Sequence, residues 1–201
     1  MTTEDLKPST VLLFQYVLAS ADMYYDEFEQ RDVFVGRDDD GHIRIWGQTA
    51  DRGPSTRIGL CRVFLEYGLY CSTWCGGAEA HCHMQYFGEQ LGHGLARYLK
   101  DHSALLASTD PTVRALEYVF EGLDACFTED HVKAGVRFLV TYCPVEDAAK
   151  RSGLSNVDLA RCGINALCRT LILDMNPHLI VKTLPETSSE FMFTMTTAAF
   201  A

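Results

Sequence analysis

Thiol, imidazole and carboxylate side chains are concentrated between residues 71 and 83, where the sequence carries Cys71, Cys75, Glu79, His81, Cys82 and His83. In a helix that begins near Glu79, the side chains of Glu79 and His83 lie one turn apart on the same face, and Cys75 is four residues further upstream. Proteins bind zinc through thiolate, imidazole and carboxylate groups. The spacing therefore predicts a zinc or iron site with Cys75, Glu79 and His83 as its ligands.

A structural interpretation of the same residues stays open. The pattern is not that of a zinc finger, because no second Cys-x-x-Cys or His-x-x-x-His pair completes it. Cysteine is among the most frequently buried residue types, so Cys71, Cys75 and Cys82 are also suited to a core. Histidines on a half-buried helix, in turn, often serve only to hydrogen-bond a neighbour.

The predicted helix carries a longer polar face. Its members are separated by four, three, four, three and four residues: Glu79, His83, Tyr86, Gln90, His93 and Arg97. We expect this face to line a pocket in which Tyr86 and His93 contact a substrate. Trp74, beside Cys75, is expected to cover that pocket.

Cys143 is the second candidate for chemistry, because it ends a strand predicted over residues 136–142 and precedes Pro144. A helix N-terminus favours the thiolate form of a cysteine, whereas the carboxylates of Glu146 and Asp147 act in the opposite direction. Cys143 is therefore either a nucleophile or a small residue at a tight strand-to-helix junction. Cys162, on the next long helix, is expected to contribute to the same pocket.

Together the two candidate regions suggest hydrolase or lyase chemistry. In this scheme Cys143 is the nucleophile or an oxyanion-side thiol, and His83 or His81 is a general base that Glu79 orients. The sequence leaves open which of the two histidines faces the pocket, because one residue of helix phase rotates a side chain by about 100°.

The composition restricts the class of protein. The chain has 201 residues, a hydrophobic fraction of 47% and a formal net charge of −10, from 17 basic and 27 acidic residues. Binding to nucleic acid or to an anionic membrane needs an excess of positive charge, so neither is expected. The acidic N-terminus also differs from a signal peptide. We expect a cytosolic protein whose eight cysteines are reduced.

Apolar periodicity predicts the elements that must position these residues. Helices are expected over residues 9–30, 56–74, 79–102 and 112–127, the last with Pro111 at its N1 position. A hairpin is expected at Asp40-Gly41, between the alternating pairs Val33/Val35 and Ile43/Ile45. The C-terminal half is expected to contain a strand over 136–142, a short helix to Lys150, a helix from Ser155 or Asn156 to Met175, and strands over 178–183 and 190–196.

This order of elements predicts a single α+β domain over residues 1–201. Its N-terminal half is helical with a β-hairpin. Its C-terminal half, in the order strand, helix, helix, strand, strand, forms a small antiparallel sheet covered by helices. The apolar helix over residues 9–30 is also suited to a homodimer interface.

A family resemblance begins at Phe138. Residues 138–144 read Phe-Leu-Val-Thr-Tyr-Cys-Pro, and they precede a short helix, a helix with Cys162 and Cys168, Asn176-Pro177 and two strands. This pattern resembles the L-2-amino-thiazoline-4-carboxylic acid hydrolase family, and it is more loosely similar to ligand-binding domains of the 4-vinyl reductase type. The chain departs from both before its final strand, where Thr187-Ser-Ser-Glu-Phe191 replaces an expected glycine and cysteine.

Two functions of different class follow from the residues and the resemblance. The hydrolase family implies a cytosolic enzyme, a hydrolase or lyase acting on a small heterocyclic or amino-acid-derived substrate that contains sulfur or nitrogen, with Cys143 in or near the pocket. The second resemblance implies a non-catalytic sensor that captures a small molecule, in some members beside a zinc bound by cysteine and glutamate. A homo-oligomeric structural domain without a site is the third interpretation.

Overall fold

The computed structural model describes residues 33–37, 43–47, 61, 64–65, 67–69, 71–73, 75–101, 110–123, 125–132, 135–184 and 191–197. The predicted helix over residues 9–30, and with it the expected homodimer interface, lies outside these residues. Among the described residues, no helix is both long and apolar enough to cross a membrane.

The predicted β-hairpin is present. Strand β1 (Val33–Arg37) pairs with β2 (Ile43–Gly47) in an antiparallel two-stranded sheet, with Val35 opposite Ile45. Both strands show the alternating apolar residues that are typical of a hairpin flanking an Asp-Gly turn.

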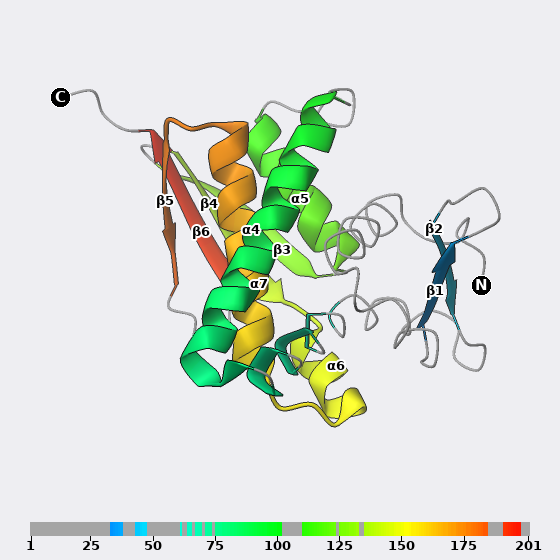
Figure 1. Cartoon of the computed structure of the whole chain (residues 1–201). Coiled ribbons are helices and arrows are strands. Elements are labelled where there is room, and N and C mark those ends of the chain that lie inside the picture. Colours follow the sequence, from blue (N-terminus) through cyan, green and yellow to red (C-terminus); the bar gives the residue numbers. More distant parts are fainter. Residues whose placement is uncertain are drawn as a thin grey trace.

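The remaining elements form an α+β fold (Figure 1). They are α4 (Gly77–Asp101), α5 (Pro111–Gly122), β3 (Cys126–Val132), β4 (Gly135–Tyr142), α6 (Val145–Ser152), α7 (Val157–Met175), β5 (Leu179–Thr183) and β6 (Phe191–Thr197). The four strands make one antiparallel sheet in the order β3-β4-β6-β5. The predicted fold class, with helices and a small antiparallel sheet, is confirmed.

The end of α5 differs from the prediction. A helix was expected to reach Phe127, but α5 ends at Gly122 and the chain then forms β3. This strand pairs only with β4 and is largely exposed, so its polar residues hide the alternation that marks a buried strand. The sheet consequently has one strand more than the sequence pattern indicated.

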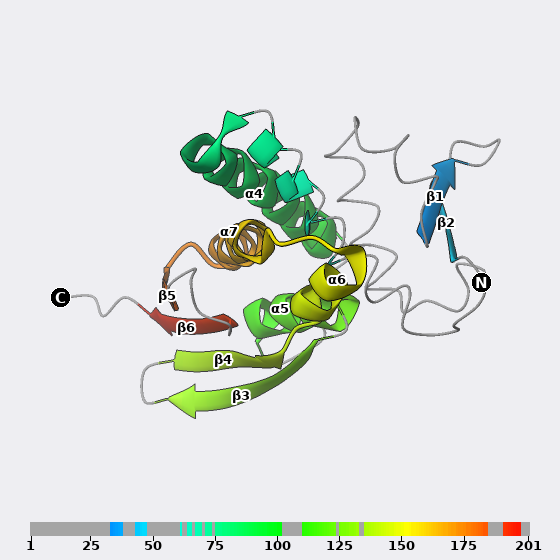
Figure 2. The same cartoon turned by 90° about the horizontal axis from the view of Figure 1, so that it is seen from below.

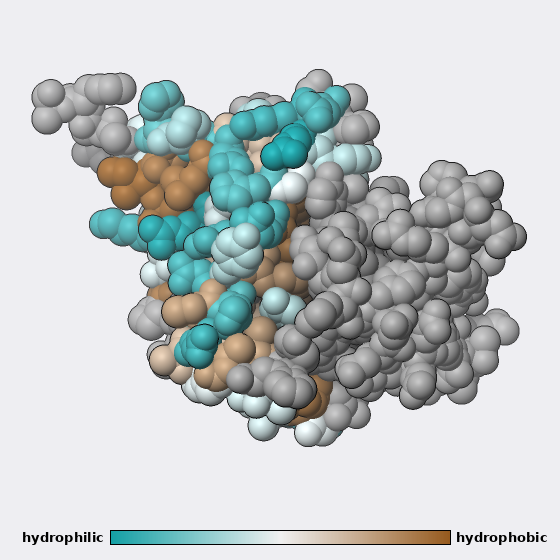
Figure 3. Space-filling view, in the orientation of Figure 1, coloured by the Kyte–Doolittle hydropathy of each residue, from teal (hydrophilic) through white to brown (hydrophobic). Residues whose placement is uncertain are grey.

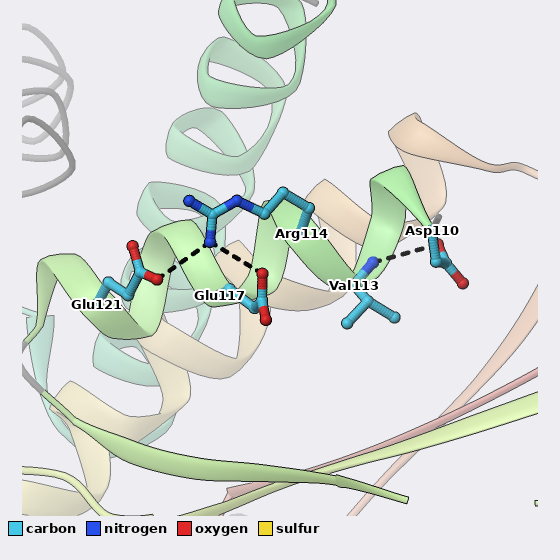
Figure 4. Close-up of polar contacts among 5 residues, drawn as sticks. All are labelled: Asp110, Val113, Arg114, Glu117 and Glu121. Atoms are coloured by element: carbon cyan, nitrogen blue, oxygen red, sulfur yellow. Dashed lines mark hydrogen bonds and ion pairs between the residues drawn. The ribbon is translucent and has the colours of Figure 1, made fainter. Parts of the chain in front are cut away.

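The start of α5 agrees with the prediction, since Pro111 occupies the first turn. Asp110 is the N-cap residue, and its Oδ1 accepts hydrogen bonds from the backbone N–H groups of Thr112 at 2.9 Å and Val113 at 3.3 Å. Further along the helix, Arg114 Nη1 lies 2.9 Å from Glu117 Oε2 and 3.0 Å from Glu121 Oε1 (Figure 4).

The helices lie in two layers over one face of the sheet. Figure 2 shows α5 and α7 next to the strands, with α4 outside α7. The strands turn alternate side chains toward these helices, so that Phe138 of β4 lies opposite Phe193 of β6 in the core. Helix α7 is therefore buried between α4 and the sheet, and ten of its residues are buried.

Helix α7 begins as predicted after Asn156, but this residue does not cap the helix with its side chain. Its Nδ2 instead donates a hydrogen bond to the carbonyl of Leu65, one of the helical residues that are described between 61 and 75. The side chain thus links the start of α7 to the segment that carries Cys75.

Candidate metal centre

Cys75 is held beside the start of α4 by aromatic packing. The described residues between 61 and 75 are helical, and Gly76, with a φ of 79°, breaks the helix before α4 begins. Phe64 and Tyr67 pack against Phe87 of α4 with ring centroids 5.8 Å and 4.2 Å apart. This packing fixes the segment against α4, so Cys75 lies next to the first turn of that helix.

The predicted ligand set comes together in the structure. Each of Cys75, Glu79 and His83 contributes one donor atom, and these three atoms lie within 4.8 Å of one another. Cys75 is half-buried, while Glu79 and His83 are exposed. Donors around a tetrahedral zinc ion are about 3.5 Å apart, so closure requires a movement of about 1 Å. Exposed side chains reach this by small rotations, and the three residues therefore have the chemistry and spacing to hold one divalent ion.

Cys71, one turn before Cys75, has different properties. Its side chain is buried, and this burial, together with the neighbouring charge of Cys75, raises its pKa to about 11. A metal ligand must be a thiolate, so Cys71 is a poor fourth ligand at neutral pH.

The raised pKa of Cys71 predicts a loss of stability at high pH. An unfolded chain releases this proton near pH 9, whereas the folded protein retains it until about pH 11. The stability that this difference in pKa contributes is complete below pH 9 and is lost as the pH rises through 11. Urea unfolding between pH 8 and 11 is expected to show a smaller decline for Cys71→Ala than for the wild type. An equal decline in stability for the two proteins would contradict the raised pKa of Cys71.

The polar face predicted on α4 is present but points to solvent. Glu79, His83, Tyr86, Gln90, His93 and Arg97 are all exposed, and Tyr86 has 62% of its surface accessible. Hydrophilic side chains run along this exposed side of α4 in Figure 3. The proposed substrate-binding roles of Tyr86 and His93 stay predictions, and Trp74 lies outside the described residues.

Two of the histidines contact the backbone or the neighbouring helix. His81 is exposed, and its Nδ1 lies 3.1 Å from the carbonyl oxygen of Gly77 in its own helix. His93 Nδ1 lies 2.7 Å from Asp174 Oδ2 near the end of α7, and Lys100 Nζ donates to the carbonyl of the same aspartate at 2.6 Å. These contacts connect α4 to α7, and His83 is left as the histidine of the candidate metal centre.

Cys143 lies in a different layer. It is half-buried at the end of β4 and packs against the core, whereas His83 is on the exposed side of α4. Because α7 lies between α4 and the sheet, the structure does not bring Cys143 and His83 together (Figure 2).

The surroundings of Cys143 also differ from those expected. Its thiol neighbour on α7 is the buried Cys168, whose pKa is raised well above the usual value by burial and, to a smaller extent, by the charge of Cys143. The nearby carboxylates have other partners. Glu146 Oε1 lies 2.6 Å from Nη2 of Arg161, and Asp147 Oδ2 accepts from the Tyr142 hydroxyl at 2.7 Å.

Cys162 faces α4 rather than Cys143. Its Sγ lies 3.9 Å from the carbonyl oxygen of His81, and the residue lines a groove between α4, α7 and β5. Cys162 and Cys168 are six residues apart on α7, so their side chains point in different directions. Cys168 is the thiol that neighbours Cys143. The sequence did not predict this contact, because a helical pattern does not indicate which strand end the helix packs against.

No family model matches the chain, and neither the curated proteins nor the solved structures contain a significant match. The protein is therefore classified here by its fold and its candidate site alone. It is an α+β protein with a cysteine–glutamate–histidine cluster at the start of a long helix that is exposed on one face.

Proposed function

We propose that this protein binds a zinc-class divalent ion through Cys75, Glu79 and His83 and acts as a metal-binding sensor domain. The proposal rests on one observation, the convergence of a thiol, a carboxylate and an imidazole donor within 4.8 Å. This donor set suits zinc and other borderline-soft ions better than magnesium or calcium, which prefer oxygen ligands. A reducing cytosol would keep Cys75 reduced and available to bind the ion.

The incomplete ligand set indicates what the sensor detects. Three protein ligands leave at least one position of a four-coordinate ion open to solvent. Zinc prefers nitrogen and sulfur donors there, so a small molecule with a thiol, thioether or amine group is the natural ligand for that position. Exposure of Glu79 and His83 makes the position accessible from outside.

The same open position supports a second candidate function. Catalytic zinc sites also use three protein ligands, and a bound ion there lowers the pKa of water and polarises a substrate. A hydrolase or lyase acting on a small sulfur- or nitrogen-containing substrate is therefore the alternative. In this version the reaction would centre on Cys75, Glu79 and His83. It would not involve Cys143, because this residue directly follows β4 and the sheet lies on the other side of α7 from α4.

Zinc binding tests the proposal directly. Protein purified without affinity-tag metals is titrated with zinc against a competing chelator, and we expect one ion per chain. Cys75→Ser and His83→Ala should each weaken zinc binding by more than about tenfold, or ~1.4 kcal/mol. His81→Ala is the matched control, because His81 is also an exposed histidine of α4 but lies outside the cluster.

Cobalt substitution adds a spectroscopic readout. A thiolate–cobalt absorption band is expected in the wild type and in His81→Ala but not in Cys75→Ser. Zinc affinity that is unchanged in both Cys75→Ser and His83→Ala would overturn the proposal. Turnover of a small substrate that requires zinc would favour the enzyme over the sensor.

A further inference from the structure

A second candidate site lies on the other flank of α4. A groove of about 440 Å³ runs between α4, α7 and β5, with lining residues that include Gln85, Glu89, Cys162, Asn165, Arg169 and Thr170. Figure 1 shows α7 between α4 and β5, so α7 forms the floor of this groove. Its volume is in the range of sites for small molecules.

The groove is independent of the candidate metal centre. Successive helix residues are rotated by about 100°, so Gln85 projects about 200° away from His83 around the axis of α4. Glu79 and His83 therefore occupy one flank of the helix, and Gln85 and Glu89 occupy the other. A ligand in the groove would not contact the metal.

Two side chains of opposite charge line the groove without forming an ion pair with each other. Glu89 of α4 is half-buried, and its Oε1 accepts a hydrogen bond from Gln85 Nε2 at 3.0 Å. Arg169 of α7 is exposed, and it forms no hydrogen bond or ion pair with another residue that the structure describes. A carboxylate and a guanidinium thus face the same groove without forming an ion pair.

Two uncharged polar side chains of α7 also line the groove. Asn165 lies one helical turn before Arg169, and Thr170 directly follows Arg169. Asn165 offers both donors and an acceptor, and Thr170 offers a hydroxyl. Apolar residues, among them Ala166 and Leu173, form the smaller part of the lining. The groove therefore favours a polar ligand over an apolar one.

We propose that this groove binds a small zwitterion of the free α-amino acid class. The guanidinium of Arg169 would hold the carboxylate, for which its planar pair of N–H donors is suited. The carboxylate of Glu89 would hold the ammonium group, and the polar side chains of Asn165 and Thr170 would contact the rest of the molecule. This site is independent of the proposed metal binding.

The test uses the full-length protein and the twenty common L-amino acids. Thermal shift and isothermal titration are measured for each, alongside the matched amines without a carboxylate and the matched acids without an amine. At least one amino acid is expected to raise Tm and to bind saturably, because a ligand that binds only the folded state stabilises it. Both analogues with a single charge should bind at least about tenfold more weakly.

Variants assign the binding to the groove. Arg169→Gln and Glu89→Gln should each weaken binding of the same amino acid by about tenfold or more. Arg97→Gln is the matched control, because Arg97 is an exposed arginine of α4 outside the groove. Far-UV circular dichroism verifies that each variant is folded.

Three results would overturn the proposal. One is the absence of binding by every amino acid at millimolar concentration. Another is binding that survives both Arg169→Gln and Glu89→Gln. The third is equal affinity for an analogue with a single charge. Cys75→Ser, which removes a proposed metal ligand, should leave amino-acid binding unchanged, so the outcome here is separable from that of the zinc titration.

Discussion

Replacing Gly88 by alanine is expected to destabilise the protein by roughly 3 kcal/mol or more. A Cβ atom at this position of α4 would lie 2.1 Å from the carbonyl oxygen of Gly163 and 2.9 Å from the backbone nitrogen of Leu167. Both are backbone atoms of α7, so no side-chain rotation can relieve the overlap. The two helices would have to move apart, and the buried side chains around them would lose contacts.

Urea unfolding of Gly88→Ala against the wild type measures this effect. Gly77→Ala is the matched control, because a Cβ at Gly77 in the first turn of α4 meets nothing within 4 Å. The control is expected to be neutral or to stabilise by about 0.5 kcal/mol, since alanine restricts the unfolded chain more than glycine does. If both variants were equally stable, α4 and α7 would not be packed with their backbones in close contact.

The fold illustrates where a local pattern is informative. Helices α4 and α7 were predicted to within two residues at each end, because their apolar residues repeat at helical spacing over many turns. Strand β3 was missed because it lies at the edge of the sheet and only Phe127 and Val132 are partly protected from solvent. An edge strand is defined by its partner, β4, and not by its own sequence.

The candidate metal centre was predictable only in part. Glu79 and His83 are four residues apart on α4, so the phase of this helix places both side chains on one face. Cys75 precedes the break at Gly76, so its position beside them depends on the aromatic packing of the preceding segment against α4. Together, the helix and this packing bring the three donor atoms within 4.8 Å.

The groove could not be predicted in the same way. Glu89 and Arg169 are 80 residues apart, and they share a groove only because α4 packs on α7 through glycine. The separation of Cys143 from His83 has the same origin. Sequence spacing indicated that each residue lies at the end of an element or on a helix face, but the order of the layers is a property of the tertiary packing (Figure 2).

A second large effect is expected for Phe120→Ala, which should destabilise the protein by about 3–5 kcal/mol. The Phe120 side chain on α5 is fully buried, with its ring centroid 5.6 Å from that of Phe138, 6.0 Å from Phe191 and 6.1 Å from Phe193. It therefore joins α5 to both central strands of the sheet. Alanine would leave a cavity that the surrounding rings cannot fill without leaving their own contacts.

Chemical denaturation of Phe120→Ala, with Tyr86→Ala as the control aromatic residue, measures this contribution. Tyr86 is 62% exposed, so its removal is expected to change the free energy of unfolding by no more than about 0.5 kcal/mol. Because both substitutions remove one aromatic ring, the difference between their free energies of unfolding measures the effect of burial. A loss below about 1 kcal/mol for Phe120→Ala would show that this ring does not hold α5 to the sheet, because a cavity of phenylalanine size in a close-packed core costs several times more.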